Sequence, residues 1–257
     1  MPFGQSRTDG DHWRAARVDR LDDLRVAQAD AHPELSTPSP TTMPLSPPDG
    51  YTADAGNEFK ETVVRGAVMY GPGDVRVEDR EAPEIVESTD AVIRVSAACV
   101  CGSDLWPYRG VEDLPWPAPM GHEYAGLVEE VGADVQTIKP GQFVVGSFWA
   151  TDNSCEICRA GYQSACVNRV PMGALGAQAD LLRVPLADGT LVATPEIPSD
   201  DLVPGLLAAS DVLGTGWFAA VAADVQPGKT VAVVGDGAVG LLAVLAAKQL
   251  GAERISP

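Results

Sequence analysis

The chain has 257 residues, which is enough for one or two domains of ordinary size. It carries 36 acidic side chains against 18 basic ones, a formal net charge of −18. This balance argues against a nucleic-acid-binding protein, which needs a basic face for backbone phosphates, and against attachment to an anionic membrane surface. Hydrophobic residues make up 45% of the chain, as in globular proteins with a sizeable core.

The N-terminal region differs in composition from the rest of the chain. Residues 32–50 are rich in proline, serine and threonine, a composition that supports neither a helix nor a central strand. We therefore predict that residues 1–62 form a disordered extension. The first residues also contain no apolar segment typical of a secretory signal peptide, which predicts a cytoplasmic protein.

Short strand patterns separated by turns dominate from residue 63 to residue 197. Val63–Tyr70 and Val75–Glu78 flank a Gly-Pro-Gly turn, and further strand patterns follow at 91–98, 126–132, 142–146 and 181–185. Closely spaced strands of this kind predict a partly closed β-barrel domain over residues 63–197.

The pattern changes to α/β over residues 198–257. Leu202, Leu206 and Leu207 recur at helical spacing, and the apolar run 231–234 predicts a strand that leads into a helix ending at Leu250. Ile255 is expected to open a second strand. A doubly wound dinucleotide-binding domain needs about six strands, so we expect this segment to be an incomplete one. Its apolar side chains would then be exposed: Val231, Val233, Leu241 and Leu245.

A glycine-rich turn joins this predicted strand to the helix. In Gly235-x-Gly237-x-x-Gly240 the first glycine permits a tight turn, the second lets the backbone approach a pyrophosphate, and the third allows close helix–strand packing. The helix N-terminus would offer free N–H groups to the phosphates. The alternative is a glycine-rich turn of an unrelated α/β protein. The residue that separates NAD from NADP lies about 20 residues further on, beyond this chain.

Three of the five cysteines lie close together, as Cys155-x2-Cys158-x7-Cys166. Without an oxidising compartment, clustered cysteines are better metal ligands than disulfide partners. Asp152, three residues before Cys155, could complete a closed tetrahedral zinc site of the structural kind. The alternative is a set of free cysteines beside a solvated aspartate, which stays open for Asp152.

A second set of metal-binding residue types is dispersed along the chain. Cys101 lies in Cys-Gly-Ser-Asp, His122 precedes Glu123, and Asp211 follows Ser210. These side chains fit an open zinc site with three protein ligands and one exchangeable position. From spacing alone, a hydrogen-bonded structural histidine is an equally good interpretation.

These motifs together resemble the zinc-containing alcohol dehydrogenases of the medium-chain dehydrogenase/reductase superfamily, and within it the formaldehyde-dehydrogenase-like branch. The similarity covers residues 66–257. It runs in order through the segment 70–78, Cys101-Gly-Ser-Asp-Leu-Trp, Gly121-His-Glu, the cysteine loop, Ser210-Asp-Val-Leu-Gly-Thr-Gly and the turn 234–241. It implies an α/β protein with a GroES-like, partly closed β-barrel catalytic domain followed by an incomplete Rossmann-type domain.

The resemblance also implies roles for individual residues. Cys101, His122 and Asp211 would bind a catalytic zinc. Glu123 would either support these ligands from outside the metal's own coordination sphere or exchange with one of them at the metal. Ser103 would hydrogen-bond the substrate oxygen and begin a proton relay. Thr215 and Val239 match residues that pack against the nicotinamide of NAD or NADP. The implied reaction is hydride transfer between this cofactor and an alcohol or aldehyde, in a family whose full-length members form homo-oligomers.

The sequence departs from the family in two places. Many relatives have a histidine five residues after the zinc cysteine, where this chain has Trp106. We expect the indole to narrow the substrate pocket and favour apolar alcohols. The incomplete cofactor domain predicts a C-terminally truncated chain without activity alone, in which self-association is doubtful.

Two alternatives remain open. One is a zinc-free quinone or enoyl reductase of the same superfamily. The other is a zinc-stabilised binding module without catalysis.

Overall fold

A computed structural model describes residues 62–256, which all lie within one compact unit, Leu45–Pro257. The predicted disordered extension, residues 1–62, therefore falls almost wholly outside the described residues and stays a prediction. The same holds for the predicted domain boundaries after residues 62 and 197.

A small antiparallel sheet opens the described part. Strand β1 (Val63–Gly71) pairs with β2 (Asp74–Glu81) on one side and with β4 (Ala118–Pro119) on the other. Buried and less buried residues alternate along the first half of β1, as expected of a strand with one face on a core. An isolated bridge between Gly66 and Ala179 connects β1 to the chain just before β9 (Leu181–Val184).

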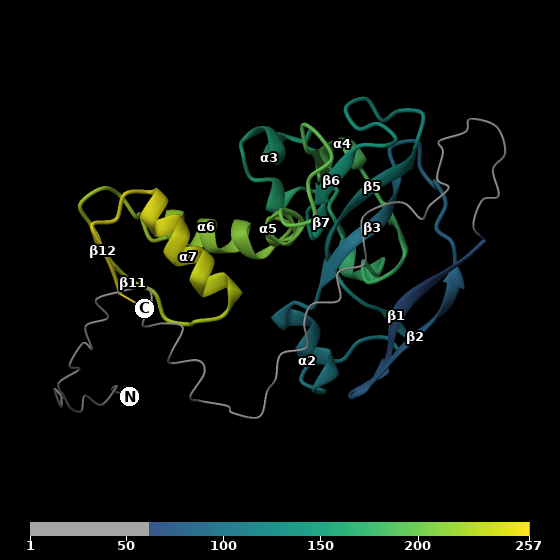
Figure 1. The fold of residues 1–257 in the computed structure, drawn as a ribbon, viewed down its shortest axis with the longest axis horizontal. Coiled ribbons are helices and arrows are strands. Elements are labelled where there is room, and N and C mark those ends of the chain that lie inside the picture. Colours follow the sequence, from purple (N-terminus) through teal and green to yellow (C-terminus); the bar gives the residue numbers. More distant parts are fainter. Residues whose placement is uncertain (1–61, 257) are drawn as a thin grey trace, which may run out of the picture. The chain divides into compact units, whose positions relative to one another are not determined.

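The main sheet has five strands in the order β10-β6-β5-β3-β9, and every neighbouring pair is antiparallel. Its core contains the fully buried side chains of Ile93, Tyr124, Val144 and Leu182. Figure 1 shows β3, β5 and β6 side by side. The strands are β3 (Ala91–Cys99), β5 (Glu123–Val131), β6 (Phe143–Gly146), β9 (Leu181–Val184) and β10 (Leu191–Ala193).

Each strand that the sequence predicts is present, whereas several shorter elements are not predictable from it. Strands β4, β7 (Trp149–Ala150) and β8 (Val170–Pro171) have two residues each, too few to show a periodic pattern. Short helices connect the strands: η1 (Gly102–Asp104), α2 (Leu105–Tyr108), α3 (Glu156–Arg159), η2 (Gln163–Ala165), η3 (Met172–Ala174) and α4 (Ala187–Thr190).

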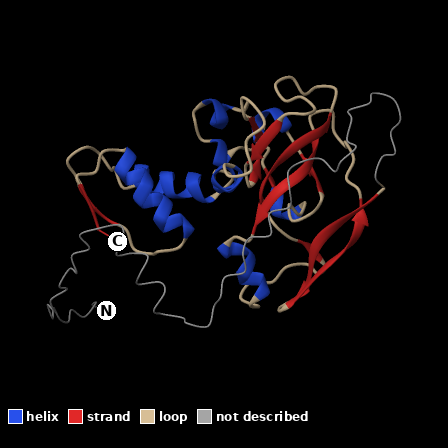
Figure 2. Ribbon diagram, viewed as in Figure 1, coloured by secondary structure: helices blue, strands red, loops and turns tan. Residues whose placement is uncertain are grey.

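The C-terminal part is helical with a two-stranded parallel sheet, as Figure 2 shows. Helix α7 connects β11 to β12, which gives a β-α-β unit. Among residues 62–256, no helix has the length and apolar character needed to cross a membrane. The elements are α5 (Val203–Ala208), α6 (Val212–Ala222), β11 (Thr230–Ala232), α7 (Ala238–Gln249) and β12 (Arg254–Ser256).

The predicted exposure of apolar side chains is confirmed for α7 and wrong for β11. Leu241 is 55% exposed and Leu245 is 43% exposed. Val231, however, pairs with Ile255 and packs beside the buried Ala246 and Ala247. The second strand expected at Ile255 is present as β12 and pairs with β11, and this pairing helps to place Val231 in a partly buried position. Val233 is only partly exposed.

Asp188 in α4 forms hydrogen bonds with the segment between β5 and β6. One carboxylate oxygen accepts the backbone N–H of Gln136 at 2.8 Å, and the other accepts the N–H and the hydroxyl of Thr137. Burial acts to raise the pKa of Asp188, but these donors outweigh it and hold the pKa below its ordinary value.

We therefore expect Asp188→Asn to lower the free energy of unfolding at pH 7 by on the order of 1 kcal/mol, as for loss of a side-chain cap on backbone N–H groups. Because the folded-state pKa is depressed, this stabilisation is present above the unfolded-state pKa and is lost as pH falls through the folded-state pKa. Urea unfolding of both proteins from pH 7 to pH 2.5 measures the difference. A gap that stays constant over this range would contradict the role given to the Asp188 charge.

Candidate functional site

Four side chains of the types that bind metals come from distant parts of the sequence and meet at one end of the main sheet. Cys101 lies in the turn after β3, His122 directly precedes β5, Glu123 begins β5, and Asp211 is the N-cap of α6. One ligand atom of each lies within 4.8 Å of those of the other three. The antiparallel pairing of β3 with β5 sets this proximity, because it places Cys99 opposite Glu123.

The two nitrogens of the His122 ring have different partners. Nε2 lies 3.2 Å from Asp211 Oδ2 and 3.4 Å from Ser103 Oγ. Nδ1 lies 3.3 Å from Asp104 Oδ1. The ring therefore turns Nε2 toward the cluster, while Asp104 holds the opposite nitrogen, as carboxylates commonly do for metal-binding histidines.

Asp104 also fixes the neighbouring cysteine. Its Oδ2 accepts the backbone N–H of Cys101 at 2.9 Å, so one carboxylate orients two members of the cluster. The sequence alone indicates no role for Asp104. The only signal for it was its place three residues after Cys101.

The site concentrates negative charge around one imidazole. Hydrogen bonds that the ring donates to Asp104, and then to Asp211, raise the pKa of His122 to about 11, against the effect of burial. Burial acts to raise the pKa of Asp211, but bonds with His122 and the Thr215 hydroxyl leave it below its ordinary value. The Asp211 carboxylate is therefore ionised, and a cation bound among these groups would balance its charge.

Glu123 shows where such a cation fits. Its side chain is 2% exposed, and its Oε1 is buried without a hydrogen-bond partner in the described part of the protein. The other oxygen, Oε2, accepts a hydrogen bond from the thiol of Cys99. Thiolate, imidazole and carboxylate together form a donor set typical of zinc.

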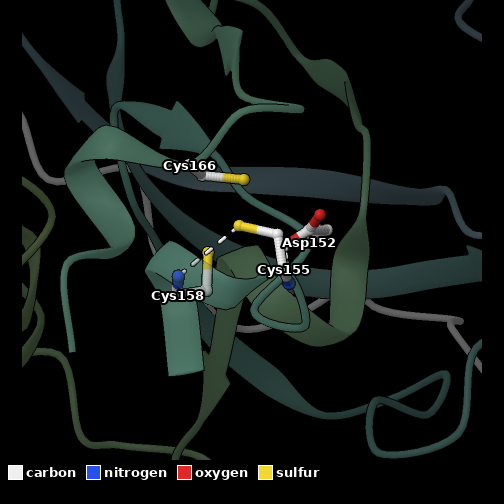
Figure 3. Close-up of side chains that lie close together, drawn as sticks. All are labelled: Asp152, Cys155, Cys158 and Cys166. Atoms are coloured by element: carbon white, nitrogen blue, oxygen red, sulfur yellow. Dashed lines mark hydrogen bonds between the residues drawn. The ribbon is translucent and has the colours of Figure 1, made fainter. Parts of the chain in front are cut away.

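The cysteine loop brings together a second group (Figure 3). Asp152, Cys155, Cys158 and Cys166 offer ligand atoms within 4.8 Å of one another. Two backbone N–H groups, of Cys158 and Asn168, donate to the sulfurs of Cys155 and Cys166 at 3.4 Å. The five cysteines of the chain are all free of disulfides.

Asp152 is held firmly in this loop. Its carboxylate accepts the backbone N–H of Ser154, the side-chain amide of Asn168 and the backbone N–H of Cys155. These donors hold its pKa well below the ordinary value, so the carboxylate is ionised.

A cavity of about 720 Å³ adjoins the first cluster. Its lining includes Cys101, Ser103, Val239 and the glycines of the turn between β11 and α7. Gly235 has a φ of +118°, and a Cβ at Gly240 would lie 1.9 Å from the oxygen of Gly235. A Cβ at Gly237 would meet nothing within 4 Å, so protein packing does not require that glycine.

Comparison with known proteins gives the family. Residues 87–196 match the alcohol dehydrogenase GroES-like domain. The chain is 37% identical over 194 residues to zinc-type alcohol dehydrogenase B of Aspergillus flavus, covering 72% of this chain and 45% of that protein. It is 33% identical over 207 residues to the glutathione-independent formaldehyde dehydrogenase of Pseudomonas aeruginosa, covering 73% and 52%.

A solved structure agrees. Alcohol dehydrogenase TADH from Thermus sp. ATN1 superposes with a TM-score of 0.68 at 35% identity, covering 74% of this chain and 56% of that one. Residues 87–196 thus form an alcohol dehydrogenase GroES-like domain, and the chain is similar to the zinc-type alcohol dehydrogenases. It spans between 45% and 66% of the length of the curated relatives it matches.

Two expectations from this family resemblance look different in the structure. Trp106 is 58% exposed on α2 and is not among the residues that line the cavity, so the structure gives no support to an indole that narrows it. Thr215 is also absent from the lining. Its hydroxyl donates to Asp211 Oδ1 at 2.9 Å, which gives this alcohol dehydrogenase homologue a further anchor for Asp211.

We expect Asp104→Ala to weaken zinc binding at the first cluster by about 10- to 100-fold, the usual cost of removing a partner that orients a metal ligand. Competition with a chromophoric chelator measures the affinity. Asp113→Ala serves as the control, because Asp113 is an exposed aspartate of the following loop. Equal affinities for the two variants would contradict the role of Asp104.

Proposed function

We propose that the chain carries the catalytic zinc site of an alcohol dehydrogenase that transfers hydride between an alcohol or aldehyde and a nicotinamide cofactor. Cys101, His122 and Asp211 would hold the zinc, with Glu123 as an additional or exchanging ligand. The observation that carries the proposal is the convergence of these four ligand atoms beside a cavity that the glycine turn also lines.

Zinc held by these residues would supply a Lewis acid that lowers the pKa of an alcohol, and a nicotinamide cofactor would supply the hydride acceptor. The residues of the chain would set the charge of the metal site and orient its ligands. One thiolate, one neutral imidazole and one carboxylate balance a double positive charge, which leaves the site able to attract an anionic oxygen. Asp104 keeps Nδ1 of His122 occupied, so Nε2 is free for the metal.

Ser103 is placed to handle the proton. Its hydroxyl lines the cavity and lies 3.4 Å from Nε2 of His122, at the border between the metal cluster and the open space. A hydroxyl both accepts and donates hydrogen bonds, so Ser103 can receive the substrate proton and pass it to water.

The nicotinamide cofactor would lie along the glycine turn. Helix α7 begins at Ala238 with Gly237 as its N-cap, so unpaired backbone N–H groups are available for phosphates. The open space at Gly237 supports close approach of a pyrophosphate. NAD and NADP are both compatible with this part of the site.

The cysteine loop would hold a second, structural zinc. Three thiolates and the Asp152 carboxylate form a complete set of four ligands, which matches a closed site. A zinc-free reductase would need neither cluster, and this disfavours that alternative. Cytoplasmic location, oligomeric state and inactivity of this chain alone stay predictions.

A cobalt-substituted protein tests the catalytic assignment without turnover. We expect benzyl alcohol to change the visible cobalt spectrum, because the cavity gives an alcohol access to the site. The change should disappear in Cys101→Ala and persist in Cys158→Ala, which affects only the cysteine loop. The same measurement with ethanol shows whether the spectral change depends on the size of the alcohol. A spectrum insensitive to every alcohol would contradict the catalytic assignment and favour a non-catalytic module.

The glycine turn gives a separate test of cofactor binding. Gly237→Ala should weaken NAD or NADP binding by about tenfold with an unchanged melting temperature, because its Cβ would occupy space left for the ligand. Gly240→Ala should instead lower the melting temperature, because its Cβ would collide with Gly235. Calorimetry and thermal unfolding measure the two effects. Tight cofactor binding by Gly237→Ala would contradict this placement.

A further inference from the structure

Cys99 is the one cysteine of the chain that belongs to neither metal-binding group. It ends β3 and lies directly opposite Glu123 in the pairing of β3 with β5. Its thiol donates a hydrogen bond to Glu123 Oε2. The sequence motifs predict a role for Glu123 and none for Cys99. The contact between the two side chains therefore indicates a function for Cys99.

The backbone explains why this thiol reaches the metal cluster. Cys101 has extended dihedral angles, φ −81° and ψ 156°, which continue the direction of β3. In extended chain, residues two apart lie on the same side, so Cys99 and Cys101 are on one side and Val100 is on the other. Val100 is accordingly 59% exposed.

The two oxygens of Glu123 have unequal surroundings. Oε2 has the Cys99 thiol, whereas Oε1 is buried without a partner among the described residues. A buried carboxylate oxygen without a donor is costly unless a cation satisfies it. The Cys99 contact therefore leaves Oε1 without a protein donor, and one carboxylate oxygen of Glu123 lies within 4.8 Å of the ligand atoms of Cys101, His122 and Asp211.

We propose that Cys99 is a positioning residue, whose thiol holds Glu123 through Oε2 so that Oε1 is presented to the metal. This inference rests on the proposed metal site. A thiol is a weak hydrogen-bond donor, so it orients the carboxylate without competing strongly with the metal for its charge. Glu123 can then bind the metal or withdraw from it while Cys99 stays in place.

The experiment compares cobalt binding by the full chain and by four variants: Cys99→Ala, Cys99→Ser, Glu123→Gln and the Cys99→Ala/Glu123→Gln double variant. Subtracting the spectrum of His122→Ala removes the contribution of the cysteine loop. We expect Cys99→Ala to weaken cobalt binding at this site by about tenfold and to shift its visible bands. Cys99→Ser keeps a donor and should recover most of the affinity.

The double variant separates positioning from a general structural effect. In the Glu123→Gln background, Cys99→Ala should cause no further loss, because the carboxylate that Cys99 holds is gone. An equal loss with and without Glu123, or no loss at all, overturns the role of Cys99. Should Cys99→Ala fail to fold, the affinity of Cys99→Ser, which must stay near that of the parent, decides the question.

The proposed metal site fails in a different way. If His122→Ala removes no cobalt signal from the parent protein, the site itself is absent and both proposals fall. If that signal is present but independent of Cys99, only the inference about Cys99 falls.

Discussion

Negative charge gathered around one imidazole is the constraint on which the rest of the site depends. Cys101, Asp104, Glu123 and Asp211 surround His122, and Glu123 is buried with one oxygen unpaired. In the protein alone, the carboxylate of Asp104, and then that of Asp211, raises the pKa of His122 to about 11. The protonated imidazole then offsets part of this negative charge. A divalent cation would satisfy the same groups and release that proton, so metal binding and imidazole ionisation exclude each other.

The β-sheet creates this concentration of charge by joining distant segments. The pairing of β3 with β5 brings the turn carrying Cys101 and Asp104 beside His122 and Glu123. Asp211 lies at the start of α6 and completes the group. Thr215, one turn further along the same helix, donates its hydroxyl to the Asp211 carboxylate. Each ligand thus sits at the end of a regular element, where the backbone is fixed but the side chain faces the cavity or the cluster.

Local sequence patterns were sufficient for some of these features and not for others. The long strands, α7 and the cysteine loop follow from periodicity and short spacing, because the interacting residues are close along the chain. Asp104 and Cys99 act through contacts that a strand register creates, and the position of Asp104 three residues after Cys101 is the only spacing signal for either residue. The second strand expected at Ile255 is present, but the partial burial of Val231 depends on its packing beside Ala246 and Ala247, which no local pattern shows. Trp106 was expected at the pocket, but it lies in the short helix α2, where its side chain is exposed at the surface.

The zinc content of the purified chain tests the central claim most directly, compared with that of Cys101→Ala and Cys158→Ala. The two groups of ligands predict about two zinc ions per chain for the parent and about one for each variant, because each substitution empties one site. A parent protein whose zinc content is unchanged by Cys101→Ala would contradict the account, since the charge around His122 would then be balanced without a metal.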